Sequence, residues 1–274
     1  MPELPEVETI KRTLRELVLH KQIQSVSVFW GKIIKHPVEV EQFSDALMGQ
    51  TILDINRRGK FLIFYTDVYA LVSHLRMEGR YNLFRSSDPI DKHTHVIFHF
   101  TDGTELRYRD VRKFGTMHLF RKGSEFEIPP LSLLGPEPLD DQFDMKEFAT
   151  KLASTRRSIK STLLDQTVVV GLGNIYVDES LFKANIHPER IAQSLSIQEV
   201  QRLYKQIVET LSEAVKKGGS TVRSYVNSQG KIGMFQFEHN VYGRKGQDCK
   251  ICGTPLIKTV VGGRGTVYCP SCQN

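Results

Sequence analysis

The sequence predicts an α+β multidomain protein, with an N-terminal helix and antiparallel β-sandwich, a helical domain and a C-terminal β-hairpin that carries cysteines. Three observations predict this fold. Short β-type apolar segments fill residues 23–120, apolar repeats at helical spacing follow a Pro-rich segment at 128–138, and every cysteine lies beyond residue 248. The domains are expected at residues 1–130, 131–235 and 236–274.

The first half of the chain contains one amphipathic helix and then strands. Val7, Ile10 and Leu14 fall on one face of a helix over residues 5–19, and Pro5 suits its first turn. The TDGT stretch at 101–104 predicts a hairpin turn. Strands are expected at 26–30, 60–65, 70–75, 95–100, 105–110 and 116–120.

The second half changes to helical spacing. Ser196 and Glu199 have the spacing of a capping box, so a helix begins there, and Gly218 with Gly219 ends it. The other helices are expected at about 141–154, at 157–165 and from Asn174 onward.

The charge distribution indicates a polyanionic partner. The chain of 274 residues has a net charge of +6, and residues 220–274 hold 7 Lys and Arg against 2 Asp and Glu. A basic segment of this kind is typical of nucleic-acid binding, although solubility is an equal explanation. No run approaches the roughly 20 apolar residues of a membrane-spanning helix, and the acidic N-terminus lacks the basic region of a secretory signal. We expect a cytoplasmic monomer.

The cysteines predict a metal site. They follow the spacing C-x2-C-x16-C-x2-C, which is typical of a four-thiolate zinc site, whereas the alternative of two disulfides is rare in a reducing cytosol. The intervening residues predict a hairpin with its turn at 262–265 and Arg264 at its tip. We expect one Zn²⁺, structural because a closed shell leaves no open position. Its ligands are Cys249, Cys252, Cys269 and Cys272.

Pro2 and Glu3 form a candidate catalytic pair. If Met1 is removed, Pro2 carries a free secondary amine, and an α-amino group titrates near ~8 against ~10.4 for lysine. More of it is therefore neutral at physiological pH, as nucleophilic attack on a sugar carbon requires. Glu3 is a candidate proton carrier beside it. A simple terminus that leads into a helix is the alternative.

Three clusters at 57–60, 74–81 and 109–116 place basic residues around Met77 and Phe114. Basic side chains neutralise phosphates, and an exposed Met or Phe wedges between base steps, whereas core packing is the alternative for these two residues.

Two glycine-containing segments add weaker signals. The stretch GLGNIYVDE (171–179) could present backbone N–H groups to a phosphate at the start of a helix, or simply pack helices. Residues 216–236 lack a periodic apolar pattern, which in a segment of this length indicates a functional or a disordered loop.

Taken together, these motifs resemble those of bacterial formamidopyrimidine-DNA glycosylase, the 8-oxoguanine repair family that also includes endonuclease VIII. The resemblance covers essentially the whole chain. It rests on the joint order of PELPEVE, RRGKFL, SHLRMEGRY, RYRDVRKFGT, GNIYVDE, VYGR and the zinc hairpin. It implies a β-sandwich, a helix–two-turn–helix domain and a zinc finger. The implied activity is removal of oxidised purines from duplex DNA, followed by strand cleavage by β,δ-elimination.

The resemblance also implies residue roles. Pro2 is the nucleophile, Glu3 handles protons at the sugar, Lys60 acts in β-elimination and Arg264 in phosphate binding and δ-elimination. Met77, Arg112 and Phe114 fill the gap left by the flipped nucleotide, and a lesion-capping loop is expected near 218–236. Further DNA contacts are implied for His74, His93, Arg156, Asn174 and Tyr242. One departure is His239, where the family usually has an apolar residue.

The sequence allows two alternative functions. The endonuclease VIII group prefers oxidised pyrimidines, but its N-terminus resembles PEGPE rather than PELPEVE. A non-catalytic damage-binding zinc protein would share the basic C-terminal segment but would not need Pro2, Glu3 and Lys60 together.

Overall fold

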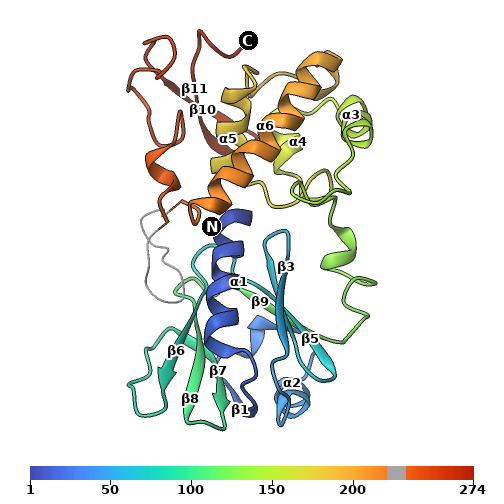
Figure 1. Cartoon of the computed structure of the whole chain (residues 1–274), viewed down its shortest axis with the longest axis vertical. Helices are drawn as coiled ribbons and strands as arrows, with labels where there is room; N and C mark the ends of the chain where they lie inside the picture. Colours follow the sequence, from blue (N-terminus) through green and yellow to red (C-terminus); the bar gives the residue numbers. More distant parts are fainter. Residues whose placement is uncertain (221–232) are drawn as a thin grey trace. The chain divides into compact units, whose positions relative to one another are not determined.

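The computed structural model describes residues 1–220 and 233–274 (Figure 1). The described residues form two compact units. The first contains residues 1–2, 6–132 and 233, and the second contains residues 3–5, 133–220 and 234–274. The helical and cysteine-bearing segments thus belong to one compact unit.

The first unit is built on two β-sheets. A four-stranded antiparallel sheet has the order β1-β7-β8-β6, and a five-stranded sheet has the order β2-β9-β5-β4-β3, in which β2 pairs with β9 in parallel. This unit contains α2 (Val40–Leu47) and α1 (Leu4–Val18) except for the first two residues of α1. A short 3-10 turn, η1 (Gly31–Ile33), also belongs to it. The strands are β1 (Ile23–Val28), β2 (Ile34–His36), β3 (Asp54–Arg58), β4 (Phe61–Tyr65), β5 (Tyr69–His74), β6 (Arg80–Arg85), β7 (Thr94–Phe100), β8 (Thr104–Arg109) and β9 (Thr116–Arg121).

One apolar core joins both sheets to the two helices. Val7, Ile10 and Leu14 of α1 are fully buried in it, as their helical spacing predicts. Phe98 of the first sheet and Leu62 of the second belong to the same cluster. The predicted sandwich is therefore confirmed, and the predicted helix, hairpin turn and six strands are present with small shifts of their ends.

Sequence reasoning missed α2 and three strands, β2, β3 and β6. The strand β2 has only three residues. In β3 (DINRR) charged and polar residues outnumber the apolar ones, and in β6 (RYNLFR) they equal them, so neither gives a clear apolar signal. Their pairing to neighbouring strands compensates for weak local preference.

The second unit contains the helices and the hairpin. Its helices are α3 (Met145–Ala153), α4 (Ile159–Leu164), α5 (Asn174–Lys183) and α6 (Ile197–Lys216), and its hairpin consists of β10 (Ile257–Val261) and β11 (Arg264–Tyr268). Short 3-10 turns are η2 (Leu131–Leu133, at the boundary of the units), η3 (Ala192–Ser194) and η4 (Phe235–Phe237). The predicted capping box is confirmed, because the Ser196 hydroxyl accepts from Glu199 N and the Glu199 carboxylate accepts from Ser196 N.

Helix α5 is the centre of this unit. Eight of its ten residues are buried, including the acids Asp178 and Glu179. It packs against α6 and α4, and β11 lies along it (Figure 1). Because α5 is buried, its acidic side chains must find hydrogen-bond donors on the segments packed around it rather than in water.

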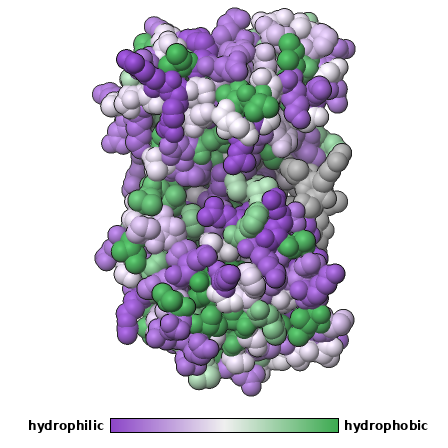
Figure 2. Space-filling model, turned by 180° about the vertical axis from the view of Figure 1, so that it is seen from behind, coloured by the Kyte–Doolittle hydropathy of each residue, from purple (hydrophilic) through white to green (hydrophobic). Residues whose placement is uncertain are grey.

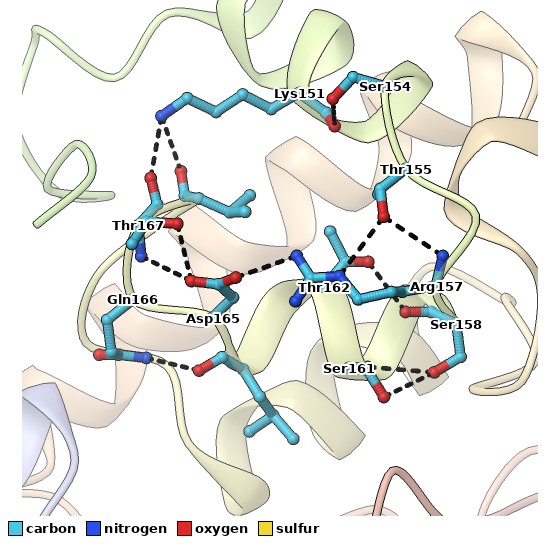
Figure 3. A network of polar contacts seen from close by, with 12 residues as sticks. Lys151, Ser154, Thr155, Arg157, Ser158, Ser161, Thr162, Asp165, Gln166 and Thr167 are labelled. Carbon is cyan, nitrogen blue, oxygen red and sulfur yellow. Dashed lines mark hydrogen bonds and ion pairs between the residues drawn. The ribbon is translucent and has the colours of Figure 1, made fainter.

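A polar network fixes the chain around α4 (Figure 3). The Asp165 carboxylate accepts from the backbone N and the hydroxyl of Thr167 and from the Arg157 guanidinium. The next residue, Gln166, donates to Leu164 O and Leu172 O and accepts from Gly171 N, each over 3.0 Å. Gln166 thus sets the backbone path that leads into α5.

The surface shown in Figure 2 has polar and apolar residues interspersed. Among the described residues, no helix has both the length and the apolar character needed to cross a membrane.

Candidate active site and zinc site

The N-terminal segment of the chain is bound to the start of α5. The buried Glu3 carboxylate accepts hydrogen bonds from Gly173 N (2.6 Å), Ile175 N (2.9 Å) and Tyr176 N (3.3 Å). Helix N-termini have unpaired N–H groups and a partial positive charge, so they bind carboxylates well. This anchors Glu3, and the position of the adjacent Pro2 follows from the covalent bond.

Two glycines permit this approach. A methyl group on Gly173 would lie 2.4 Å from Cδ of Glu3, which is far inside contact distance. Gly171 has φ of +88°, and a methyl group there would lie 2.5 Å from the Leu4 side chain. Leu4 N also donates to Gly171 O over 3.0 Å. The backbone N–H groups of Gly173, Ile175 and Tyr176 therefore bind a carboxylate of this chain itself.

Asn174, Tyr242 and Arg264 are brought to the same end of α5. The Asn174 amide donates to Gly265 O over 2.8 Å, next to the exposed Arg264. Burial raises the pKa of the Tyr242 phenol, and the Glu3 and Asp178 charges raise it further. The hairpin turn consists of Gly262 and Gly263, so Arg264 is the first residue of β11 and pairs with Val261, one step beyond the expected tip.

The segment before Tyr242 is held by Glu179 and His239. The fully buried Glu179 carboxylate accepts from the backbone N of Asn240, Val241 and Tyr242 at 2.8–3.0 Å. His239 is buried between the Phe235 and Tyr242 rings and shares a hydrogen bond of 2.9 Å with the Ser220 hydroxyl. A polar residue at this position is thus accommodated by a polar partner.

The four cysteines form a compact cluster that fits a zinc ion. Their sulfur atoms all lie within 4.8 Å of one another. Cys249 Sγ lies 3.9 Å from Cys272 Sγ, and Cys252 Sγ lies 3.5 Å from Cys269 Sγ. Tetrahedral Zn–S bonds of about 2.3 Å place sulfurs nearly 4 Å apart, whereas a disulfide needs about 2.05 Å. The cluster therefore holds one structural zinc ion and excludes the disulfide alternative.

In the first unit, Lys60 directly precedes Phe61, the residue of β4 that pairs with His74 of β5. Buried Lys60 follows Gly59 in the two-residue turn between β3 and β4, and His74 ends β5. Burial lowers the pKa of His74 to about 3, with smaller effects from the charges of Arg76 and Lys60. Its Nδ1 accepts from Arg76 N over 2.9 Å, so the neutral ring carries its proton on Nε2.

The loops of Met77 and of Arg112 with Phe114 meet at Tyr108. Methyl groups on Gly79 and Gly115 would lie 2.2 Å and 1.7 Å from the Tyr108 hydroxyl oxygen, so both loops pack against it. Phe114 is 51% exposed and lies under the Arg112 guanidinium, 4.7 Å from it. Exposure of Phe114 and half-burial of Met77 suit the wedge interpretation better than core packing.

The buried Asp110 shapes the second of these loops. Its carboxylate accepts from the backbone N of Arg112 (3.0 Å), Phe114 (2.9 Å) and Gly115 (2.9 Å). Its backbone N donates to His93 O, which ties the predicted contact His93 to the same loop.

Arg156 is exposed in the turn between α3 and α4. Of the expected lesion-capping loop, residues 221–232 lie outside the described residues.

Sequence reasoning missed polar residues that support the site, namely the buried Asp110, Asp178, Glu179 and Lys160 and the half-buried Gln166. One signal was available: two adjacent acids between the apolar residues of the helix NIYVDESLFK indicate buried carboxylates with specific partners.

Comparisons with known proteins match this arrangement over the whole chain. Residues 1–117 match the formamidopyrimidine-DNA glycosylase N-terminal domain, residues 134–226 its H2TH (helix–two-turn–helix) domain, and residues 246–274 the zinc finger found in FPG and IleRS. Formamidopyrimidine-DNA glycosylases of Cytobacillus firmus and Halalkalibacterium halodurans are 61% and 60% identical over 273 residues, covering 100% of both chains in each case.

Solved structures agree. The Lactococcus lactis Fpg bound to DNA with an abasic site has a TM-score of 0.93 at 43% identity, covering 99% of each chain. The same protein bound to Fapy-dG DNA has a TM-score of 0.92 at 42% identity, covering 99% of this chain and 100% of that one.

The fold and the site define a helix–two-turn–helix DNA glycosylase with a four-cysteine zinc finger. More specifically, the chain belongs to the formamidopyrimidine-DNA glycosylase family.

Proposed function

We propose that this chain excises oxidised purines, 8-oxoguanine and formamidopyrimidines, from duplex DNA and then cleaves the strand at the abasic site. Full-length relatives at about 60% identity support the glycosylase activity, and the DNA-bound structures of L. lactis Fpg support the duplex partner. The observation that carries the residue assignment is the Glu3 carboxylate, held by three backbone N–H groups beside Pro2. In this proposal the enzyme works in the bacterial cytoplasm, at the nucleoid.

The chemistry requires Pro2 to be the first residue. Its amine lone pair attacks C1′ of the damaged nucleotide, the bond from C1′ to the base breaks, and the base leaves with the proton that the amine gives up. Opening of the C1′–O4′ bond then gives an iminium that keeps its positive charge, while O4′ takes a proton. The fixed Glu3 carboxylate stabilises that charge and relays protons at the sugar.

Strand cleavage follows from the iminium. Loss of a C2′ proton lets the 3′ phosphate leave (β-elimination), and a second proton loss lets the 5′ phosphate leave (δ-elimination). We assign Lys60 to the first step and Arg264 to phosphate binding in the second. The wedge residues Met77, Arg112 and Phe114 fill the space of the extruded nucleotide, while His74, His93, Arg156, Asn174 and Tyr242 bind the backbone.

Borohydride trapping tests the nucleophile. A duplex with 8-oxoguanine opposite cytosine is reduced in the presence of the protein, and peptide mass analysis locates the adduct. We expect it on Pro2, with Met1 absent. Pro2→Leu, whose larger second residue retains Met1, should bind the duplex but lose trapping by roughly a hundredfold or more. An adduct at another residue overturns the assignment, and preferential cleavage of a thymine glycol duplex favours the endonuclease VIII alternative.

A further inference from the structure

A buried ion pair joins α4 to α5. Lys160 Nζ lies 2.6 Å from Asp178 Oδ1, and both side chains have no exposed surface. Burial raises the pKa of Asp178 to about 7 and lowers the pKa of Lys160, while attraction between the two partly offsets both changes. Because desolvation costs as much as pairing returns, such a pair adds little net stability over apolar residues of similar size. Its partners therefore indicate its role.

The remaining polar capacity of the pair is directed at β11. Asp178 Oδ2 accepts from Val267 N over 3.2 Å, and Lys160 Nζ donates to Gly265 O over 3.3 Å. The Asn174 amide donates to the same carbonyl oxygen. The two contacts hold the strand at the residues one and three positions after Arg264.

The turn of the hairpin is also packed against α4. Gly262 has φ of +55°, and a methyl group there would lie 2.3 Å from the Ser161 hydroxyl. The hairpin is thus held at its turn by α4 and along β11 by the ion pair. The same helix α5 binds Glu3 at its first turn. The charges of both Glu3 and Arg264 act on the Lys160 ammonium, which places all three in one electrostatic environment.

We propose that Lys160 and Asp178 are positioning residues for Arg264: the pair holds β11 so that the Arg264 guanidinium has a fixed place relative to the Glu3 carboxylate. The inference rests on the proposed role of Arg264 in δ-elimination. It assigns the pair an effect on δ-elimination, the second cleavage of the damaged strand, and none on base excision by Pro2.

The experiment separates positioning from stability. Lys160→Met combined with Asp178→Leu replaces the pair by apolar residues of similar size, so folding and zinc content are retained while both polar tethers to β11 are lost. The assay uses a duplex with a preformed abasic site and measures β- and δ-elimination products on a sequencing gel. We expect the ratio of δ to β product to fall roughly tenfold, because small misplacements of a reacting group are costly. Base excision, measured separately on a duplex with 8-oxoguanine opposite cytosine, should change less than about twofold.

Two matched variants complete the test. Lys183→Met with Glu213→Leu removes an ion pair of 2.9 Å between α5 and α6 that does not contact the hairpin, and it should leave the product ratio unchanged. Arg264→Ala should lower the ratio at least as far as the Lys160 and Asp178 double variant.

The outcomes are distinguishable. If Arg264→Ala lowers the ratio but the zinc-loaded double variant does not, the positioning inference is overturned and the function of Arg264 stands. If Arg264→Ala leaves the ratio unchanged, the proposed role of Arg264 is wrong, and the inference falls with it. If the double variant slows base excision as much as δ-elimination, the pair serves general stability instead.

Discussion

The Glu3 carboxylate oxygen Oε2 lies 2.6 Å from the backbone nitrogen of Gly173, 170 positions further along the chain. This hydrogen bond and its two neighbours fix the candidate proton carrier against α5. Since the nucleophile is the preceding residue, the long-range contact also restricts where the Pro2 amine lies.

The close approach of Gly173 predicts a severe effect of Gly173→Ala. The added methyl group would lie 2.4 Å from Cδ of Glu3 and would displace the carboxylate. We expect borohydride trapping to fall roughly a hundredfold, because misplacement of about 1 Å at a reacting group has that effect. Gly31→Ala is the control, since its methyl group would meet only a Val40 side chain at 3.0 Å. Unchanged trapping in Gly173→Ala would show that Glu3 placement is unimportant.

Zinc removal should unfold the finger and spare the β-sandwich. Structural zinc contributes about 10–16 kcal/mol of folding free energy in isolated fingers. The apolar cluster around the cysteines is small, so it cannot keep the finger folded once the metal is lost. The single tryptophan, Trp30, belongs to the first unit and reports on it by fluorescence. We expect chelation to abolish tight binding to an abasic-site duplex while the Trp30 emission stays the same. A shift of that emission on metal loss would contradict the prediction.

Acid should destabilise the protein through His74. Its folded-state pKa of about 3 lies below the unfolded value near 6.5, so its contribution to stability is fully present above pH 6.5 and is lost as pH falls. By pH 5 the loss is about 2 kcal/mol. Urea unfolding measures the free energy of unfolding at pH 7 and at pH 5. The drop in this free energy between the two pH values should be smaller for His74→Asn than for the parent chain. His20→Asn, at an exposed histidine, should keep the parent difference. Equal differences for all three proteins would refute the interpretation.

Asp110→Asn should disturb the wedge loop. An amide group cannot accept all three backbone N–H donors of Arg112, Phe114 and Gly115. Each buried donor left unpaired costs about 1–3 kcal/mol. We expect weaker binding to an 8-oxoguanine duplex, with binding to undamaged duplex changed less, because phosphate contacts dominate the latter. Asp45→Asn, at an exposed acid of α2, is the control, and equal loss for both duplexes would argue against a lesion-specific role.

The sequence by itself determined the elements whose cause is local. The helix over 5–19 follows from apolar spacing, the start of α6 from its capping box, and the zinc site from two C-x2-C pairs; each of these patterns is read from residues a few positions apart, and a short hairpin brings the two pairs together. The order of motifs was also sufficient to indicate the family, which the comparisons confirm.

Only the tertiary structure decided which groups those motifs bind. The backbone at the start of α5 binds the Glu3 carboxylate, and Asp178 and Glu179 bind backbone of β11 and of residues 240–242. A buried carboxylate must find donors, but the local sequence does not say which distant segment supplies them. That choice depends on the path of the chain through the packed unit, and this is why the supporting acids were missed while the zinc ligands were found.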